Sequence, residues 1–263
     1  MPNAPLPPRG DLRSRVKDGE TTIGAWAMLG SPPAAEILAR AGFDWLVVDL
    51  EHGFGTEADL FGLLHAVQST TTAAIVRVQS SERLRIGRAL DMGADGLMIP
   101  RLERESEIRE ALSWIRYPPD GIRGVALGMR GAALGEIGHD EVRGLNERLL
   151  SAFQVESPVA VEAAAELAAI DGVDVLFVGP ADLSHSMGMP GRIRERAFLD
   201  ALRQVVDGCR SNGKAPGILL QTVDDLPAAL DQGFTFVGIG SDGGWVRSAA
   251  RASVAAAREA IAR

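Results

Sequence analysis

The chain has 263 residues, with a hydrophobic fraction of 46%, a charged fraction of 24% and a net charge of −8 at pH 7. This is the composition of an ordinary soluble globular protein, and its acidic balance argues against a nucleic-acid partner or an anionic membrane surface. The first twenty residues lack the apolar core of a secretory signal, and no run of about 18 apolar residues occurs. The sequence therefore predicts a cytoplasmic protein without a membrane span. Its one cysteine, Cys209, excludes an internal disulfide and is expected to be a buried small side chain.

Eight apolar runs along the chain are predicted to form strands. Thr22–Met28 is the first, and four others follow a glycine that suits the left-handed position just past a helix. Continuous apolar runs are typical of parallel strands that are buried on both faces. The four glycine-led segments are Gly42–Val48, Gly93–Ile99, Gly172–Val178 and Gly233–Ile239. The remaining runs are Ala73–Val78, Leu149–Val155 and Ala215–Leu220.

Amphipathic patterns between these runs predict helices. They cover Pro33–Ala41, Glu57–Val67, Glu82–Met92, Glu105–Ile115, Pro158–Ile170, Arg194–Ser211 and Val223–Leu230. Eight strands alternating with helices in about 250 residues predict a (β/α)₈ TIM barrel. A doubly wound open sheet is the alternative, but no Gly-x-Gly-x-x-Gly turn follows the first strand. We expect one barrel domain over residues 1–263.

Three segments extend a minimal barrel. Residues 1–20 form a short N-terminal extension. Tyr117–Arg148 is an insertion before the fifth strand, with a turn at its start and a short helix at Asp140–Leu150. A loop of this length usually has a function, so we expect a subunit contact or an active-site edge. The last helix, about Trp245–Ala262, is rich in alanine and either forms an oligomer interface or packs on its own barrel.

Ionisable side chains gather where the predicted strands end. The second strand ends in Asp49, Glu51 and His52, and alternation places the two carboxylates on one face. The third strand carries Arg77 inside an otherwise apolar run, which requires an anion: a barrel carboxylate or a substrate oxygen. The carboxyl ends of barrel strands are where active sites form. This concentration predicts an enzyme.

Two further carboxylates end neighbouring strands. Glu156 follows the fifth strand and Asp182 the sixth. Together they suit a hard divalent cation such as Mg²⁺ or Mn²⁺, although either could instead cap the helix that follows it. His52 is the candidate general base, and Asp91 is the carboxylate to test as the group that orients its ring.

The lysines and the other histidines limit the reaction mechanisms that the site could use. The only lysines are Lys17 and Lys214, and neither is expected at the carboxyl ends of the strands. A Schiff-base mechanism needs a lysine inside the site, so carbonyl chemistry here would need a metal. His65, His139 and His185 are interpreted as structural or solvated.

Seven motifs give the chain a resemblance to the HpcH/HpaI aldolase family of the phosphoenolpyruvate/pyruvate barrel superfamily. The resemblance extends from about residue 20 to residue 255. The motifs are Gly24–Trp26, Ala41–Trp45, Asp49–His52, Tyr117–Gly124, Gln154–Glu156, Gly179–Ser184 and Lys214–Ile218.

The resemblance implies a class II pyruvate aldolase. Such an enzyme cleaves 4-hydroxy-2-oxo acids reversibly to pyruvate and an aldehyde through a metal-stabilised pyruvate enolate. It also implies a divalent Mg²⁺, Mn²⁺ or Co²⁺ ion and a homo-hexamer, a trimer of dimers, with exchanged C-terminal helices. After Gly124 the sequence Val125–Arg130 departs from the family pattern, so the identity of the aldehyde stays open, as does whether Arg123 or Arg130 serves its own or a neighbouring site.

The resemblance also implies a role for each matched residue. Glu156 and Asp182 would hold the metal, with Asp49 and Glu51 ordering its water. His52 with Asp91 would be base and acid, and Arg77 would stabilise the enolate oxygen. The substrate-binding residues implied are Trp26, Gln154, Gly179, Pro180, Ala181 and Asp182.

Two alternatives remain. A CoA-thioester lyase of the citryl or malyl type shares the barrel and the metal carboxylates, but it needs a basic rim, for which the acidic composition gives no sign. A binding or scaffold protein on the same barrel would be expected to lack a base or a metal ligand, yet His52, Arg77, Glu156 and Asp182 are all present.

Overall fold

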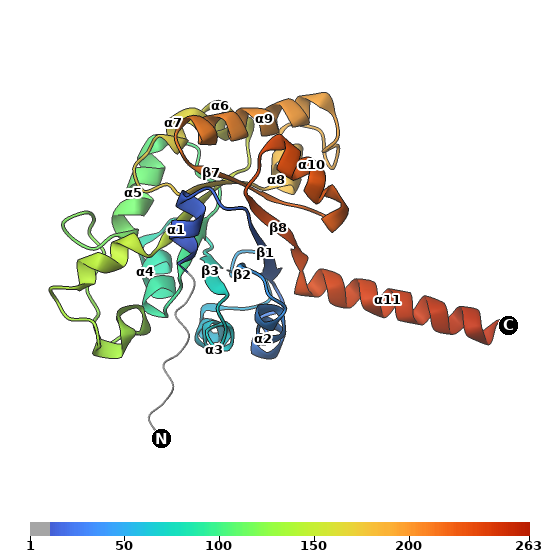
Figure 1. The fold of residues 1–263 in the computed structure, drawn as a ribbon, viewed down its shortest axis with the longest axis horizontal. Coiled ribbons are helices and arrows are strands. Elements are labelled where there is room, and N and C mark those ends of the chain that lie inside the picture. Colours follow the sequence, from blue (N-terminus) through green and yellow to red (C-terminus); the bar gives the residue numbers. More distant parts are fainter. Residues whose placement is uncertain (1–10) are drawn as a thin grey trace, which may run out of the picture.

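The computed structural model describes residues 11–263 as a closed barrel of eight parallel strands in sequential order (Figure 1). The strands are β1 (Thr22–Ala27), β2 (Trp45–Asp49), β3 (Ala73–Arg77), β4 (Gly96–Ile99), β5 (Leu150–Val155), β6 (Val175–Val178), β7 (Ala215–Leu219) and β8 (Phe236–Ser241). β8 pairs with β1 and closes the barrel. The predicted (β/α)₈ fold is confirmed.

Helices follow the strands around the barrel. They are α2 (Pro32–Arg40), α3 (Glu57–Val67), α4 (Arg83–Asp91), α5 (Glu105–Ile115), α6 (Pro158–Glu162), α7 (Ala164–Ala168), α8 (Pro180–Ser186), α9 (Arg196–Ser211), α10 (Leu226–Gln232) and α11 (Asp242–Ile261). The glycine before four strands has the expected positive φ, for example +96° at Gly42 and +103° at Gly233. The short helix α8, directly after β6, was not predicted.

The core has two apolar layers. Aliphatic side chains fill the space between the strands and the surrounding helices, whereas aromatic rings fill the barrel interior. Trp45 stacks on Phe236 with ring centroids 4.1 Å apart, and Trp26 lies against Trp45 and Phe177. Side chains therefore pack the barrel as a solid core, and the chemistry is restricted to its ends.

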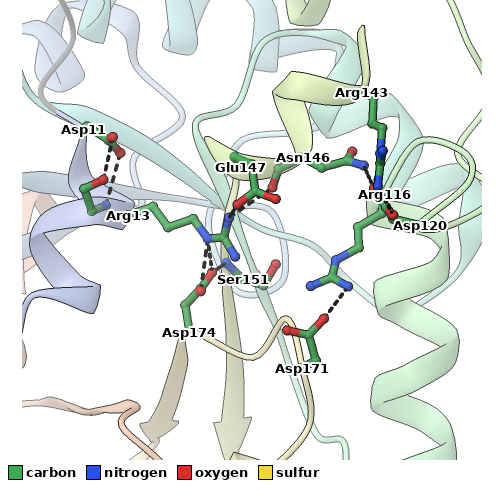
Figure 2. A network of polar contacts seen from close by, with 11 residues as sticks. Asp11, Arg13, Arg116, Asp120, Arg143, Asn146, Glu147, Ser151, Asp171 and Asp174 are labelled. Atoms are coloured by element: carbon green, nitrogen blue, oxygen red, sulfur yellow. Dashed lines mark hydrogen bonds and ion pairs between the residues drawn. The ribbon is translucent and has the colours of Figure 1, made fainter.

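A short helix, α1 (Leu12–Lys17), closes the amino end of the barrel. Leu12 and Val16 are buried within the interior cluster, and the Arg13 Nε donates to both oxygens of Asp174 at 3.0 Å (Figure 2). Residues 1–10 of the predicted extension lie outside the described residues. From residue 11 onward, the segment is part of the barrel core.

The insertion at residues 117–148 also lies at the amino end. It connects the end of α5 to the start of β5, and Asn146 within it accepts from the Tyr117 backbone N–H at 2.8 Å. It contains two 3₁₀ helices, η1 (Arg130–Gly135) and η2 (Val142–Glu147), the second being shorter than the predicted helix. Helices in this fold return the chain from the carboxyl to the amino end of the barrel. The insertion therefore lies away from its own active site, and the predicted subunit contact stays a prediction.

The last helix, α11, projects away from the barrel (Figure 1). Asp242 is its one buried residue, and its carboxylate accepts from the Met28 and Leu29 backbone N–H groups at 2.9 and 3.1 Å. Val246, Val254 and Ile261 are exposed. The alternative that this helix packs along its own barrel is therefore wrong. No helix within residues 11–263 is long and apolar enough to cross a membrane.

Candidate active site

A buried ion pair between β2 and β3 forms the base of the site. Asp49 and Arg77 are register partners in the sheet, so their side chains lie side by side. The guanidinium donates to both oxygens of the Asp49 carboxylate, from Nε at 2.9 Å and from Nη2 at 2.6 Å. Both side chains are buried. Burial alone would lower the pKa of Arg77, but the hydrogen bond to Asp49 and its negative charge outweigh that effect and raise it. Arg77 is therefore a fixed cation.

Asp49 also orders the loop that follows β2. Its Oδ1 accepts from the backbone N–H groups of Glu51 and His52, at 3.0 and 3.2 Å. The Glu51 carboxylate lies 3.1 Å from Arg77 Nη1, and His52 Nε2 lies 3.8 Å from Glu51. The His52 side chain is 59% exposed, so it faces solvent at the mouth of the site.

Gln154 connects the arginine to the predicted metal ligand on β5. Its Oε1 accepts from Arg77 Nη1 at 3.4 Å, and its Nε2 donates to Glu156 Oε1 at 2.9 Å. Gly179, after β6, lies so close that an added Cβ would be 2.7 Å from the same Glu156 oxygen. Only glycine fits beside the carboxylate, so strands β3, β5 and β6 converge on Glu156.

The surroundings of Glu156 disfavour its negative charge, as expected of a carboxylate that binds a cation. Burial, followed by the negative charges of Asp182 and Glu51, raises the pKa of Glu156 to about 7. Burial likewise raises the pKa of Glu51. A divalent cation would relieve this repulsion. Within residues 11–263 no three or more His, Cys, Asp or Glu side chains form a metal cage. Two carboxylates with open positions fit a hard ion that keeps several waters.

The segment after β6 contributes the second predicted ligand. Gly179 precedes α8, Pro180 is the first residue of the helix, and Asp182 is in its first turn. Ala181 and Asp182 are exposed. The backbone N–H groups in the first turn of a helix have no intrahelical acceptor, so they are available to an anion.

Trp26 is more deeply buried than a pocket-lining residue. It is 2% exposed, and its ring lies 5.3 Å from Phe177 and 5.8 Å from Trp45, centroid to centroid. Its ring belongs to the packed interior of the barrel, so its predicted contact with substrate stays a prediction.

Sequence reasoning missed Arg101, which follows β4. It lines a pocket together with Gln154 and Glu156, and its positive charge favours the ionised form of Glu156. Arg101 has φ +55°, a left-handed conformation that non-glycine residues rarely adopt. Its position just after the end of a predicted strand could have identified Arg101 as a candidate site residue.

Comparison with known proteins agrees with this geometry. Residues 22–249 match the family model described as HpcH/HpaI aldolase/citrate lyase. The chain belongs to this family. A hydroxypyruvate/pyruvate aldolase from Delftia acidovorans is 38% identical over 94% of this chain and 92% of its own. A 5-keto-4-deoxy-D-glucarate aldolase from Klebsiella pneumoniae is 35% identical over 95% and 96%. A crystal structure of an HpcH/HpaI aldolase/citrate lyase family protein from Burkholderia cenocepacia superposes with a TM-score of 0.89 at 35% identity, covering 94% and 98%.

Membership in the HpcH/HpaI family identifies the chain as a carbon–carbon lyase. Its two lysines lie away from the carboxylates. Lys17 ends α1 at the amino end of the barrel, and Lys214 directly precedes β7 at the same end. No lysine of the chain can therefore form a Schiff base at the site, in agreement with the sequence prediction.

The predicted pair of His52 and Asp91 is not brought together within one chain. Asp91 ends α4, near the amino end of the barrel, and accepts from Arg123 Nη2 at 3.1 Å. His52 follows β2 at the carboxyl end. The proposed orienting role of Asp91 can therefore be filled only by Asp91 of another copy.

Cys209, His65 and His139 lie on elements apart from the site, whereas His185 lies on α8 beside Ala181. Cys209 is fully buried as predicted, and burial raises the pKa of its thiol to about 12. His65, His139 and His185 are all exposed. His185 makes one contact, from Nδ1 to the Ala181 carbonyl oxygen at 2.8 Å.

Proposed function

We propose that this chain is a divalent-metal-dependent aldolase that reversibly cleaves 4-hydroxy-2-oxo acids to pyruvate and an aldehyde. The observation that carries the proposal is the buried series of contacts Asp49–Arg77–Gln154–Glu156. It holds the positive charge of Arg77 near the Glu156 carboxylate, whose raised pKa suits a ligand of a metal cation. The two relatives described above are named as aldolases of hydroxypyruvate or pyruvate and of 5-keto-4-deoxy-D-glucarate.

Arg77 is proposed to face the oxygen that gains negative charge when pyruvate loses a methyl proton. Asp49 fixes the guanidinium through Nε and Nη2, and Nη1, which contacts Glu51 and Gln154, is the nitrogen proposed to reach the substrate. A preorganised donor stabilises developing charge without reorganisation, and this is usually the largest single catalytic effect. Gln154, which contacts the same nitrogen, would hold it in position.

Glu156 and Asp182 are proposed to hold the cation, with Glu51 and Asp49 ordering water beside it. A bound divalent ion would polarise the ketone of pyruvate as a Lewis acid. Mg²⁺, Mn²⁺ and Co²⁺ all suit oxygen ligands of this kind. The backbone N–H groups of Ala181 and Asp182 are proposed to bind the pyruvate carboxylate, beside Gly179 and Pro180.

His52 is proposed as the general base and acid. It is exposed at the mouth of the site, where it could take the C4 hydroxyl proton of an incoming 4-hydroxy-2-oxo acid. A carboxylate that orients the ring would have to be Asp91 of a second copy, at the exposed end of its own barrel. The insertion and the projecting α11 fit such an assembly, and we propose a homo-hexamer, a trimer of dimers, with exchanged C-terminal helices. A cytoplasmic location remains a prediction.

The test is exchange of the methyl protons of pyruvate in D₂O, followed by NMR with and without Mg²⁺ or Mn²⁺. Metal-dependent exchange that is lost in Arg77→Met would support the proposed half-reaction without requiring the correct aldehyde. Exchange that is absent although the metal binds would contradict it. The CoA-thioester lyase would then be tested, by protection of the protein against heat by CoA esters.

A further inference from the structure

Gln79 lies just past the carboxyl end of β3, on the side of the strand that faces the site. Val76 and Val78 pack outward in the layer between the strands and the helices, and Arg77 between them points inward. The Val78 N–H still donates to the Met98 carbonyl oxygen of β4 at 3.2 Å, so the extended pairing continues to that residue. Alternation then places Gln79 on the inner side, one step beyond Arg77.

The side-chain amide of Gln79 has no partner in the protein. Its Oε1 is buried and receives no hydrogen bond within residues 11–263. Its Nε2 makes none within this range either, and it is the end of the half-buried side chain that reaches solvent. A buried carbonyl oxygen without a donor costs free energy, which an apolar side chain of the same length would avoid. Folding alone therefore does not explain a glutamine at this position.

The sheet register places this amide beside the loop that carries the proposed base. Asp49 and Arg77 are register partners of β2 and β3. Two residues beyond them lie Glu51 and Gln79, and His52 follows Glu51 directly. The Glu51 carboxylate lies 3.1 Å from Arg77 Nη1, which keeps the loop against β3. The Gln79 amide and the His52 ring therefore come from adjacent strands, at a similar height above Arg77.

Two oxygen atoms gain negative charge in the proposed reaction, and Arg77 accounts for one of them. It faces the C2 oxygen of the pyruvate enolate. When the enolate carbon bonds to the aldehyde carbon, the π electrons of the aldehyde carbonyl move onto its oxygen, which then takes a proton from His52. No donor has yet been assigned to this second oxygen before the proton arrives. Such a donor has to be an N–H or O–H group held near His52.

We propose that Gln79 Nε2 donates a hydrogen bond to the carbonyl oxygen of the aldehyde, the oxygen that becomes the C4 hydroxyl. Gln79 is then a substrate-binding residue that stabilises the developing C4 alkoxide, and in the cleavage direction it orients the C4 hydroxyl towards His52. The inference rests on the proposed aldolase function and adds a residue to its site. Because every aldehyde has this oxygen, the contact is independent of the rest of the aldehyde.

The test measures addition of pyruvate to three aldehydes with unlike substituents: glycolaldehyde, succinic semialdehyde and butanal. Gln79→Met removes the amide at nearly constant length, and Gln79→Leu repeats the loss with another apolar side chain. Each should lower kcat/KM about 10- to 100-fold for all three aldehydes, as expected when one donor to a charged oxygen is lost. The loss should appear in kcat more than in the KM of the aldehyde, because the oxygen accepts most strongly once it is charged.

Two further measurements separate this role from a structural one. Pyruvate proton exchange involves no aldehyde, so it should be unchanged in both variants. Urea unfolding of Gln79→Met should have a midpoint no lower than that of the wild type, because the variant loses an unsatisfied buried oxygen. Gln204→Met, at an exposed position of α9, is the matched control and should leave all three measurements unchanged.

Unchanged addition in Gln79→Met and Gln79→Leu would overturn the proposal. A loss confined to one aldehyde would also overturn it, since the amide would then contact the substituent. An equal loss of exchange, or a lower unfolding midpoint, would show that Gln79 serves the pyruvate half-reaction or the fold instead. A wild type that exchanges but converts none of the three aldehydes would contradict a contact that is independent of the substituent. Absence of exchange from the wild type would instead show that the proposed aldolase function fails, and the Gln79 proposal with it.

Discussion

Asp49 and Arg77 form a two-pronged ion pair between adjacent strands, with Nε–Oδ1 and Nη2–Oδ2 distances of 2.9 and 2.6 Å. Asp49 is 1% exposed and also accepts from the two backbone N–H groups that lead into His52. One carboxylate therefore fixes both the direction of the cation and the course of the loop that carries the proposed base. Removing it should affect stability and chemistry together.

Asp49→Asn should both destabilise the fold and reduce turnover. The substitution removes the buried negative charge beside Arg77 and leaves Glu51 as its charged partner. Breaking a buried pair typically costs roughly 3–5 kcal/mol. Turnover should fall by roughly 10²–10³, the usual loss when a positioned donor is displaced. Urea unfolding gives the first quantity, and pyruvate proton exchange gives the second.

Glu36→Gln is the matched control for this change. Glu36 pairs with Arg40 at 2.9 Å on an exposed helix face. Exposed pairs contribute about 0–1 kcal/mol, so this variant should unfold with nearly the wild-type midpoint and keep full exchange. Equal midpoints for the two variants would show that the Asp49–Arg77 pair does not stabilise the fold.

Metal affinity should fall as the pH is lowered through about 7. The pKa of Glu156 is raised to about 7 by burial and by neighbouring carboxylates, so below that pH a proton competes with the cation. With one proton displaced, the affinity for Mn²⁺ should drop by about tenfold per pH unit below 7 and level off above it. Calorimetry at pH 6, 7 and 8 measures this, and a flat profile would contradict the assignment of Glu156 as a ligand.

The raised pKa of Glu156 also predicts how the stability of the metal-free protein changes with pH. The folded pKa of Glu156 lies above its ordinary value of 4.5, so its contribution favours folding below that pH and is lost as the pH rises through about 7. The difference in unfolding free energy between Glu156→Gln and the wild type should therefore grow across this interval, by roughly 3 kcal/mol at most. Adding Mn²⁺ should remove this loss in the wild type and leave the variant unchanged.

Periodicity and glycine positions were enough to predict the barrel. All eight predicted strands are present, because buried parallel strands and helix-end glycines leave strong local signals. The helix α1 was missed because its burial depends on Leu12 and Val16 meeting the barrel interior, a contact between distant parts of the chain. The short α8 was missed because seven residues give too little periodicity.

The carboxyl ends of the strands were enough to predict that carboxylates and Arg77 gather at one end of the barrel, but not that Asp49 is the carboxylate that pairs with Arg77. The salt-bridge alternative for Arg77 is confirmed, and its role towards substrate stays a prediction. Arg101 could not be distinguished from a surface arginine, because its positive φ and its pocket arise only from the packed loop. The sequence also could not show that Asp91 and His52 lie at opposite ends, since that follows from the path of α4.

A mixing experiment tests whether Asp91 serves His52 of another copy. His52→Ala and Asp91→Asn should each lose most turnover when expressed alone. If His52 of one copy meets Asp91 of another, random co-assembly of the two variants restores the pair in about one quarter of the sites. Co-expressed chains should then regain about that fraction of wild-type turnover, measured after both tags are used for purification. A mixture no more active than the separate variants would exclude the shared pair.

Removal of residues 245–263 should leave the barrel folded and change its assembly. A stop after Gly244 keeps the Asp242 contacts to Met28 and Leu29, and it deletes an exposed segment that contains Val246, Val254 and Ile261. Exposed apolar side chains gathered on one element mark a protein contact, and a helix that projects alone is marginal in water. Light scattering should show a smaller assembly, and thermal unfolding followed by circular dichroism should remain cooperative, as expected of a folded barrel. Val254→Asp should act in the same direction, whereas Glu259→Gln, at an exposed pair with Arg263, should not. A truncated chain with the full-length assembly would show that α11 does not mediate the contact.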